Sequence, residues 1–145
     1  MKRHSILIII IFGTLLSLAC ENATNNITLK TGILEGKITI GPLCPIEPCN
    51  LPPEQIAAIY EARKVFVYEK SSLSKIAEIQ LNADGEYSVA LNPGQYIVDV
   101  SDANGNALPL ELSQRPRFGN AIPQEAEILE DQTTISDFDI DTGIR

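Results

Sequence analysis

The sequence has few residues of the types that carry chemistry. Its 145 residues include one histidine, His4, no tryptophan and three cysteines. Catalysis by a Ser-His-Asp or Cys-His arrangement needs a histidine next to the nucleophile, and His4 lies in a segment that we expect to be removed. The mature chain would then lack both arrangements, and it shows no glycine-rich phosphate loop. We therefore predict no catalytic residues, no cofactor and no metal, and a protein that is not an enzyme.

Basic residues are also scarce, since 11 lysines and arginines face 19 acidic residues. The net charge is −8 and the pI is about 4.6. An acidic surface repels the phosphate backbone of nucleic acids, so we expect no nucleic-acid partner. The same charge opposes docking on anionic lipid headgroups. Attachment to a membrane would therefore require a covalent lipid.

The one long apolar run lies at the N-terminus. Residues 1–5 are cationic, and the 14 residues 6–19 are mostly apolar. A spanning helix needs about 20 apolar residues, whereas a signal-peptide core needs about 7–15. The run ends at Ala19-Cys20, where the sequence turns polar. This pattern resembles a bacterial lipoprotein signal, which implies cleavage before Cys20 and a diacylglycerol on its sulfur. The alternatives are an ordinary secretory signal cut near Ala19, with Cys20 unmodified, and an uncleaved signal anchor.

We divide the chain into a signal peptide over residues 1–19, a flexible Asn/Thr-rich tether over 20–31 and one domain over 32–145. In the domain, apolar and polar residues alternate with a period of two, which is typical of half-buried strands. Turn residues such as Asp84-Gly85 separate these segments at intervals of roughly 8–12 residues. This spacing predicts an all-β fold, a single antiparallel Greek-key β-sandwich of about seven strands. The expected strands lie at residues 33–41, 63–70, 76–82, 86–91, 95–100, 125–129 and 136–141.

One short helix is expected to begin at Pro53. Pro53 suits the first position of a helix, and Ile56, Ile59 and Tyr60 have helical spacing. We expect about two turns that cap one end of the sandwich. Residues 102–124, with scattered Gly, Asn and Pro, are expected to form a loop.

Four stretches of the sequence point to a family. They are GKITIGPLCP, VFVYEK, LNADGEYSVALNPGQYIVDV and the terminal FDIDTGIR. Together they resemble carboxypeptidase regulatory-like, transthyretin-like (prealbumin-like) domains over most of residues 32–145. The resemblance implies a Greek-key sandwich and carries over no catalytic residue, because such domains accompany or display chemistry. Residues 50–62 are longer than usual for this group.

The remaining cysteines, Cys44 and Cys49, form an even pair in an exported, oxidising setting. Structural zinc needs four ligands, and a thioredoxin-like motif needs Cys-x-x-Cys. Neither fits two cysteines separated by four residues, so we predict a disulfide. The proline-flanked ring either presents Ile46 and Glu47 to a partner or merely ends the first strand and covers an edge; we favour the second.

Acidic and aromatic side chains offer weaker candidates for a site. Residues 102–106 and 137–141 are rich in oxygen ligands, but the first lacks the spaced carboxylates of a calcium loop, and we expect ordinary turn and surface roles for both. Among the aromatic residues, we expect Tyr87, Tyr96 and Phe138 in the core. Phe66, Tyr68 and Phe118 are candidates for stacking on a sugar.

These observations predict a non-enzymatic, membrane-anchored lipoprotein that displays a β-sandwich as a structural, adhesion or assembly module of the cell envelope. Its partners would be the membrane, through the lipid on Cys20, and an unknown envelope protein or glycan. The alternatives are a glycan- or peptide-binding module, and an extracellular protease inhibitor that acts through the Cys44–Cys49 loop. We expect an exported, lipid-anchored location. Glu21, in place of the aspartate that retains some lipoproteins in the inner membrane, favours the outer membrane.

Overall fold

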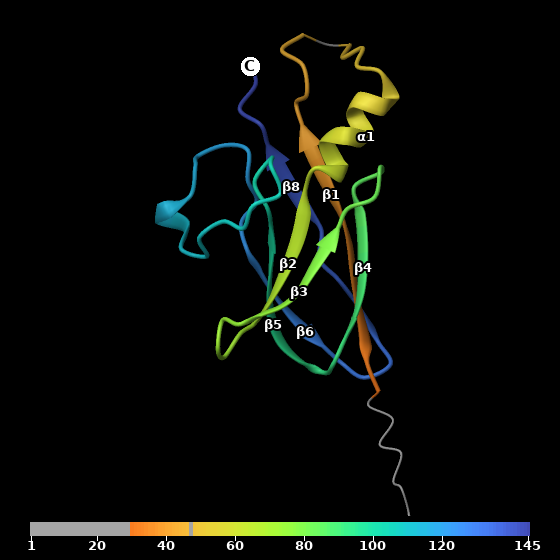
Figure 1. Cartoon of the computed structure of the whole chain (residues 1–145), viewed down its shortest axis with the longest axis vertical. Coiled ribbons are helices and arrows are strands. Elements are labelled where there is room, and N and C mark those ends of the chain that lie inside the picture. The colour runs from red at the N-terminus through yellow and green to blue at the C-terminus, as the bar shows by residue number, and fades with distance from the viewer. Residues whose placement is uncertain (1–29, 47) are drawn as a thin grey trace, which may run out of the picture.

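Two packed β-sheets and one short helix make up the computed structural model, which describes residues 30–46 and 48–145 (Figure 1). The predicted signal peptide, Cys20 and most of the tether lie outside the described residues. No helix in the described ranges is long and apolar enough to cross a membrane. The predicted all-β sandwich is confirmed. Its elements are β1 Gly32–Gly41, α1 Pro53–Glu61, β2 Lys64–Glu69, β3 Lys75–Gln80, β4 Glu86–Leu91, β5 Gly94–Val100, the 3-10 turn η1 Leu112–Gln114, β6 Gln124–Ile128, β7 Thr133–Ile135 and β8 Phe138–Asp141.

The two sheets contain four strands each. One has the order β4-β1-β7, with β8 also paired to β1, and the other has the order β3-β2-β5-β6. β1 is antiparallel to β4 but parallel to β7 and β8, which corrects the expectation of antiparallel pairing throughout. The reason is that the chain leaves β6 in the second sheet, turns, and then runs along β1 in the same direction. β7, with three residues, is the strand that the sequence pattern did not reveal.

The core lies between the sheets and follows the predicted alternation. Leu34, Ile38 and Ile40 of β1 are buried, whereas Ile33, the residue before Leu34, is 42% exposed. Burial of one face of each strand supplies the main driving force for folding. Ile59 and Tyr60 of α1 pack against this core, so the helix covers one end of the sandwich, as expected. The buried core residues include the three aromatics assigned to it: Tyr87, Tyr96 and Phe138.

A tyrosine crosses the first sheet over a glycine. Tyr87 of β4 pairs with Gly36 of β1, and its hydroxyl donates a hydrogen bond to the Ser136 carbonyl at 2.5 Å. A Cβ on Gly36 would lie 2.0 Å from the Ser136 oxygen and 3.0 Å from the Tyr87 ring. Burial raises the pKa of Tyr87 to about 12, so the phenol remains a hydrogen-bond donor. The missing side chain of Gly36 therefore lets Tyr87 tie β4 to the junction of β7 and β8.

That junction is completed by a side chain. The Ser136 N–H donates to the Glu35 carbonyl at 2.9 Å, which continues the pairing of β7. The next donor of β1, the Lys37 N–H, bonds to the Asp137 carboxylate at 2.7 Å. Asp137 therefore replaces a backbone carbonyl where the strand is interrupted, and β8 resumes the parallel pairing beyond it.

We expect Gly36→Ala to lower the free energy of unfolding by about 1–3 kcal/mol, because the added methyl group overpacks the site. Gly41→Ala, at the end of the same strand, is the matched control, since a Cβ there meets nothing within 4 Å. Urea unfolding of both variants measures the difference. Equal midpoints for the two variants would show that the Tyr87 crossing does not require a glycine.

Candidate functional site

The connections of the sandwich are unevenly distributed between its two ends. Where β1 begins, the strands are joined by short turns over residues 70–74, 92–93 and 129–132. The opposite end carries the disulfide loop, α1, the long loop over residues 101–123 and the last residues of the chain (Figure 1). We call this second end the loop end. Because binding residues concentrate on loops held by a rigid scaffold, it is the first place to look for a site.

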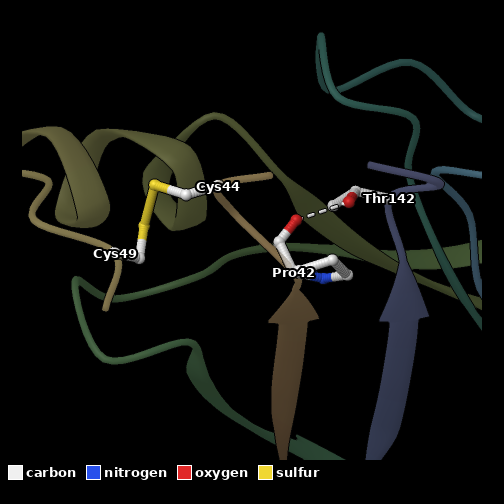
Figure 2. Close-up of a disulfide and its surroundings, with 4 residues drawn as sticks. All are labelled: Pro42, Cys44, Cys49 and Thr142. Carbon is white, nitrogen blue, oxygen red and sulfur yellow. Dashed lines mark hydrogen bonds between the residues drawn. A yellow bond between two sulfur atoms is a disulfide. The ribbon is translucent and has the colours of Figure 1, made fainter. Parts of the chain in front are cut away.

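A disulfide joins Cys44 and Cys49 directly after β1, in agreement with the predicted pairing (Figure 2). Their Cα atoms lie 5.4 Å apart. Ile46 within the ring is 77% exposed, and Glu47 lies outside the described residues. The ring therefore projects an apolar side chain into solvent at the loop end.

The residues after β8 hold the start of this ring. The Thr142 N–H donates to the Gly41 carbonyl at 3.0 Å, and the Thr142 hydroxyl donates to the Pro42 carbonyl (Figure 2). The Asp141 carboxylate accepts hydrogen bonds from the Gly143 N–H at 2.9 Å and from Arg145 at 2.7 Å. The Arg145 guanidinium holds the pKa of Asp141 at about 2, well below its usual range. The last residues are thus ordered by local contacts and fix the base of the disulfide loop.

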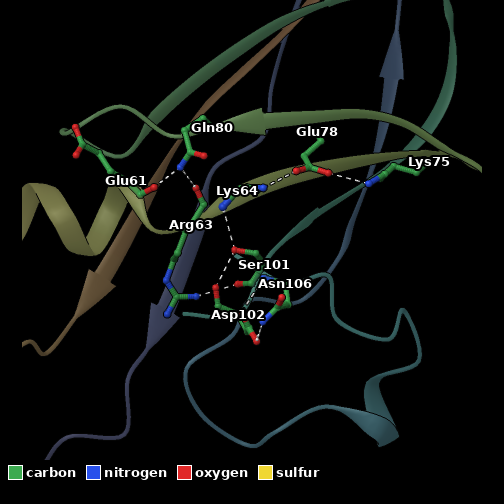
Figure 3. Close-up of polar contacts among 9 residues, drawn as sticks. All are labelled: Glu61, Arg63, Lys64, Lys75, Glu78, Gln80, Ser101, Asp102 and Asn106. Atoms are coloured by element: carbon green, nitrogen blue, oxygen red, sulfur yellow. Dashed lines mark hydrogen bonds and ion pairs between the residues drawn. The ribbon is translucent and has the colours of Figure 1, made fainter. Parts of the chain in front are cut away.

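A buried arginine organises the middle of the loop end. Arg63 is 3% exposed, and its guanidinium donates to the Ser101 carbonyl at 2.9 Å (Figure 3). It also donates to the Gly119 carbonyl at 3.2 Å. Its Nε atom is buried and has no hydrogen-bond partner. Desolvation lowers the pKa of Arg63, and the charge of Asp102 opposes this change. Arg63 therefore joins the start of β2 to both ends of the long loop.

The first oxygen-rich segment, residues 102–106, is a turn closed by its own side chains. The Asp102 carboxylate accepts a hydrogen bond from the Asn106 N–H at 2.8 Å (Figure 3) and another from the Asn104 N–H at 2.8 Å. This is the local capping that Asp favours in turns. In the part of the chain that the structure describes, no three His, Cys, Asp or Glu residues come together as metal ligands.

An ion pair that the sequence pattern did not indicate lies under the long loop. Alternation places Asp99 of β5 on the outward face, yet it is fully buried. Arg115 of the loop makes a bidentate contact with it, which includes a 3.0 Å hydrogen bond. Arg115 also donates to the Pro109 and Ala121 carbonyls at 2.6 and 2.8 Å. The pair therefore fastens residues 109–121 onto the outer face of the second sheet.

The exposure of the aromatic side chains shows which of the three candidates for sugar stacking are accessible. Phe66 pairs with Asp99 in the register of β2 and β5 and is only 3% exposed, so its proposed stacking on a sugar is wrong. The Lys75 ammonium lies 5.2 Å from its ring centroid. Tyr68, 6.4 Å from the Phe66 ring, is partly buried. Phe118, at the loop end, is 43% exposed and is the aromatic candidate that stays available.

A surface hollow of about 560 Å³ lies between β1, β4 and the end of β3. Three of its polar side chains, Lys37, Asn82 and Glu86, contact one another. Lys37 lies 3.9 Å from Glu86, and the Asn82 amide donates to Glu86 at 3.2 Å. These three groups already have partners, which makes the loop end the better candidate for a site.

No protein-family model and no curated protein sequence matches this chain. Solved structures with a similar arrangement include a DUF3823 family protein from Parabacteroides merdae, at a TM-score of 0.47 and 16% identity, covering 78% of this chain and 47% of that one. They also include GBS52, the minor pilin of Streptococcus agalactiae, at 0.45 and 11% identity, covering 79% and 45%. The Bacillus anthracis TIE protein has a TM-score of 0.47 and 12% identity, covering 78% and 17%. This chain spans less than half the length of each, and no function is transferred from them. The resemblance to transthyretin-like domains stays a prediction.

We expect Arg115→Met to lower the free energy of unfolding by about 3–5 kcal/mol, because it leaves the Asp99 carboxylate buried without a counter-charge. Adding Asp99→Val should recover most of that loss, since an apolar pair needs no compensation. Lys70→Met is the matched control, with an exposed partner in Glu125, and should change stability by about 0.5 kcal/mol or less. Chemical denaturation measures all three. A cost for Arg115→Met no larger than that of the control would contradict the anchoring role.

Proposed function

We propose that this chain is a non-enzymatic, exported lipoprotein. Its β-sandwich is anchored through a lipid on Cys20 and displays the loop end to a protein or glycan of the cell envelope, as a structural or adhesion module. The observation that carries the proposal is the position of the two ends. The N-terminal segment enters β1 at Gly32, whereas the disulfide loop follows Gly41 at the other end of the same strand (Figure 1).

The length of β1 gives this arrangement a scale. A strand of 10 residues rises by about 3.3 Å per residue and therefore spans roughly 33 Å. A lipid upstream of Gly32 would hold the short-turn end near the membrane and leave the loop end roughly that distance farther out. A module that presents contacts to a partner benefits from this orientation.

The composition of the loop end supports contact with a partner more than chemistry. Ile46 and Phe118 are exposed apolar side chains on segments that are fixed by a disulfide and by hydrogen bonds. Pre-ordered loops lose less conformational entropy when they bind. The transthyretin-like resemblance points to the same kind of role.

Anchoring is tested by producing the full chain in a Gram-negative host supplied with labelled palmitate. We expect the wild type to incorporate the label and to sediment with membranes. Cys20→Ala should abolish both, because it removes the sulfur that would carry the lipid. Cys49→Ala is the control, since it removes a cysteine outside the signal and should leave labelling unchanged. Label retained in Cys20→Ala would contradict the proposed anchor.

Display is tested with a photo-crosslinking residue placed at Ile46 and, as a matched control, at Leu129. Both side chains are exposed aliphatics, at 77% and 44%, but they lie at opposite ends of the sandwich. We expect crosslinks to another envelope component from position 46 and few from position 129, as read by gel shift in intact cells. Equal crosslinking from both positions would show that the loop end is not the contact surface.

A further inference from the structure

The basic residues of the described chain are nearly all paired with carboxylates. Of the 11 lysines and arginines, Lys2 and Arg3 lie outside the described residues. Seven of the remaining nine form ion pairs: Lys30, Lys37, Lys64, Lys70, Lys75, Arg115 and Arg145. Within residues 30–46 and 48–145, the exceptions are Arg63 and Arg117. A chain with 19 acidic residues has no shortage of carboxylates, so these two cations without a salt bridge stand out.

Both exceptions lie at the same place in the loop end. The buried Arg63 guanidinium donates to the Gly119 carbonyl at 3.2 Å. The Arg117 guanidinium lies 5.1 Å from the centroid of the Phe118 ring, and that of Arg145 lies 5.7 Å from it. Three arginine side chains thus converge on residues 117–119, and Asp141 neutralises one of them through its pair with Arg145.

The backbone around this cluster is fixed before any ligand arrives. The Gly119 N–H donates to the Asp141 carbonyl at 2.7 Å. A Cβ on Gly143 would lie 2.7 Å from Phe118 Cγ, so the ring lies directly against the backbone of the last residues. Phe118 is held between the long loop and the C-terminal segment, and it holds both guanidiniums through cation–π contacts.

A guanidinium without a partner has a planar fork that matches a carboxylate in two parallel hydrogen bonds. The half-exposed Phe118 ring offers apolar surface beside that fork. A polyanion would be repelled by the net charge of −8, which favours a ligand with one isolated negative charge. The side-chain amide of Asn120 already donates to the Pro116 and Phe118 carbonyls. This amide nitrogen is therefore not available to bond the hydroxyls of a sugar.

We propose that Arg117 binds a single carboxylate of a peptide or protein partner, with the apolar side chain next to that carboxylate resting on Phe118, which Arg145 holds from the other segment. This proposal deepens the proposed function and rests on it in one respect, namely that the loop end faces the partner. The buried Arg63 lies behind Gly119, where the charge of Asp102 partly offsets its own, so the site depends on Arg117.

The probe is an acetylated pentapeptide, Gly-Ser-Gly-Ala-Leu, with a free C-terminal carboxylate, compared with the same peptide as a C-terminal amide. Nuclear magnetic resonance titration of the full ¹⁵N-labelled chain in detergent reports the site. We expect the acid to shift the amide signals of residues 117–119 and 143–145. The amide peptide should bind about tenfold more weakly or worse, since it lacks the charged acceptor. Equal binding of acid and amide, or no shift at about 10 mM acid, would overturn the proposal.

Three variants separate a built site from diffuse attraction. Arg117→Gln should weaken binding of the acid by about tenfold, and Arg117→Lys should give an intermediate value because it keeps the charge and loses the fork. Lys30→Gln removes the same charge at the opposite end and should change binding by about twofold or less. Equal losses in Lys30→Gln and Arg117→Gln would overturn the proposal. So would Arg117-dependent binding of glucuronate without binding of the peptide, which would assign the site to an acidic sugar.

The result of the peptide-binding test can be distinguished from the result of the anchoring test. Cys20→Ala alters lipid attachment and leaves residues 117–145 unchanged, so loss of anchoring with intact peptide binding would contradict only the lipoprotein proposal. Intact palmitate labelling without peptide binding would contradict only the carboxylate site.

Discussion

The double pairing of β1 is the constraint on which the rest of the structure depends. This strand takes β4 along one edge and β7 and β8 along the other, so the first and last strands of the described chain lie side by side and run in the same direction. The parallel direction places the residues after Asp141 at the end where the disulfide loop begins, and Thr142 can then bond to Gly41 and Pro42. Gly36 makes the arrangement possible, because Tyr87 crosses it to reach Ser136.

The sequence predicts the strands well because a period of two records locally which face is buried. Leu34, Ile38 and Ile40 needed no partner to be assigned to the core. The direction of a strand relative to its neighbours cannot be predicted in this way, because parallel and antiparallel strands show the same alternation. β7 escaped prediction since three residues, Thr133–Ile135, are too few to display a period. The helix was predictable from Pro53 and the spacing of its apolar residues, both of which are local signals.

The candidate site likewise has features that the sequence predicts and features that it does not. Counting cysteines was enough to pair Cys44 with Cys49, because the prediction needed only an even number of cysteines and an expected oxidising setting. Asp99 was misplaced because an outward side chain in a strand normally meets water, whereas here the long loop covers that face. Three leucines and an arginine within residues 108–115 were the available signal that this loop is not fully solvated. Which sheet face it covers is a tertiary fact that no periodicity records.

The excess of carboxylates bears on the carboxylate site that we propose. Within residues 30–46 and 48–145, seven of nine cations are already paired with carboxylates, and the net charge of −8 slows association with anions by repulsion. One uncompensated positive point in such a field attracts a negative group only when that group is small enough to avoid the surrounding acids. Complementary charge then contributes more to partner choice than to raw affinity. The loop end combines this point with a fixed aromatic ring and a disulfide-closed loop, and the specificity that we propose for it arises from the position and sign of charge.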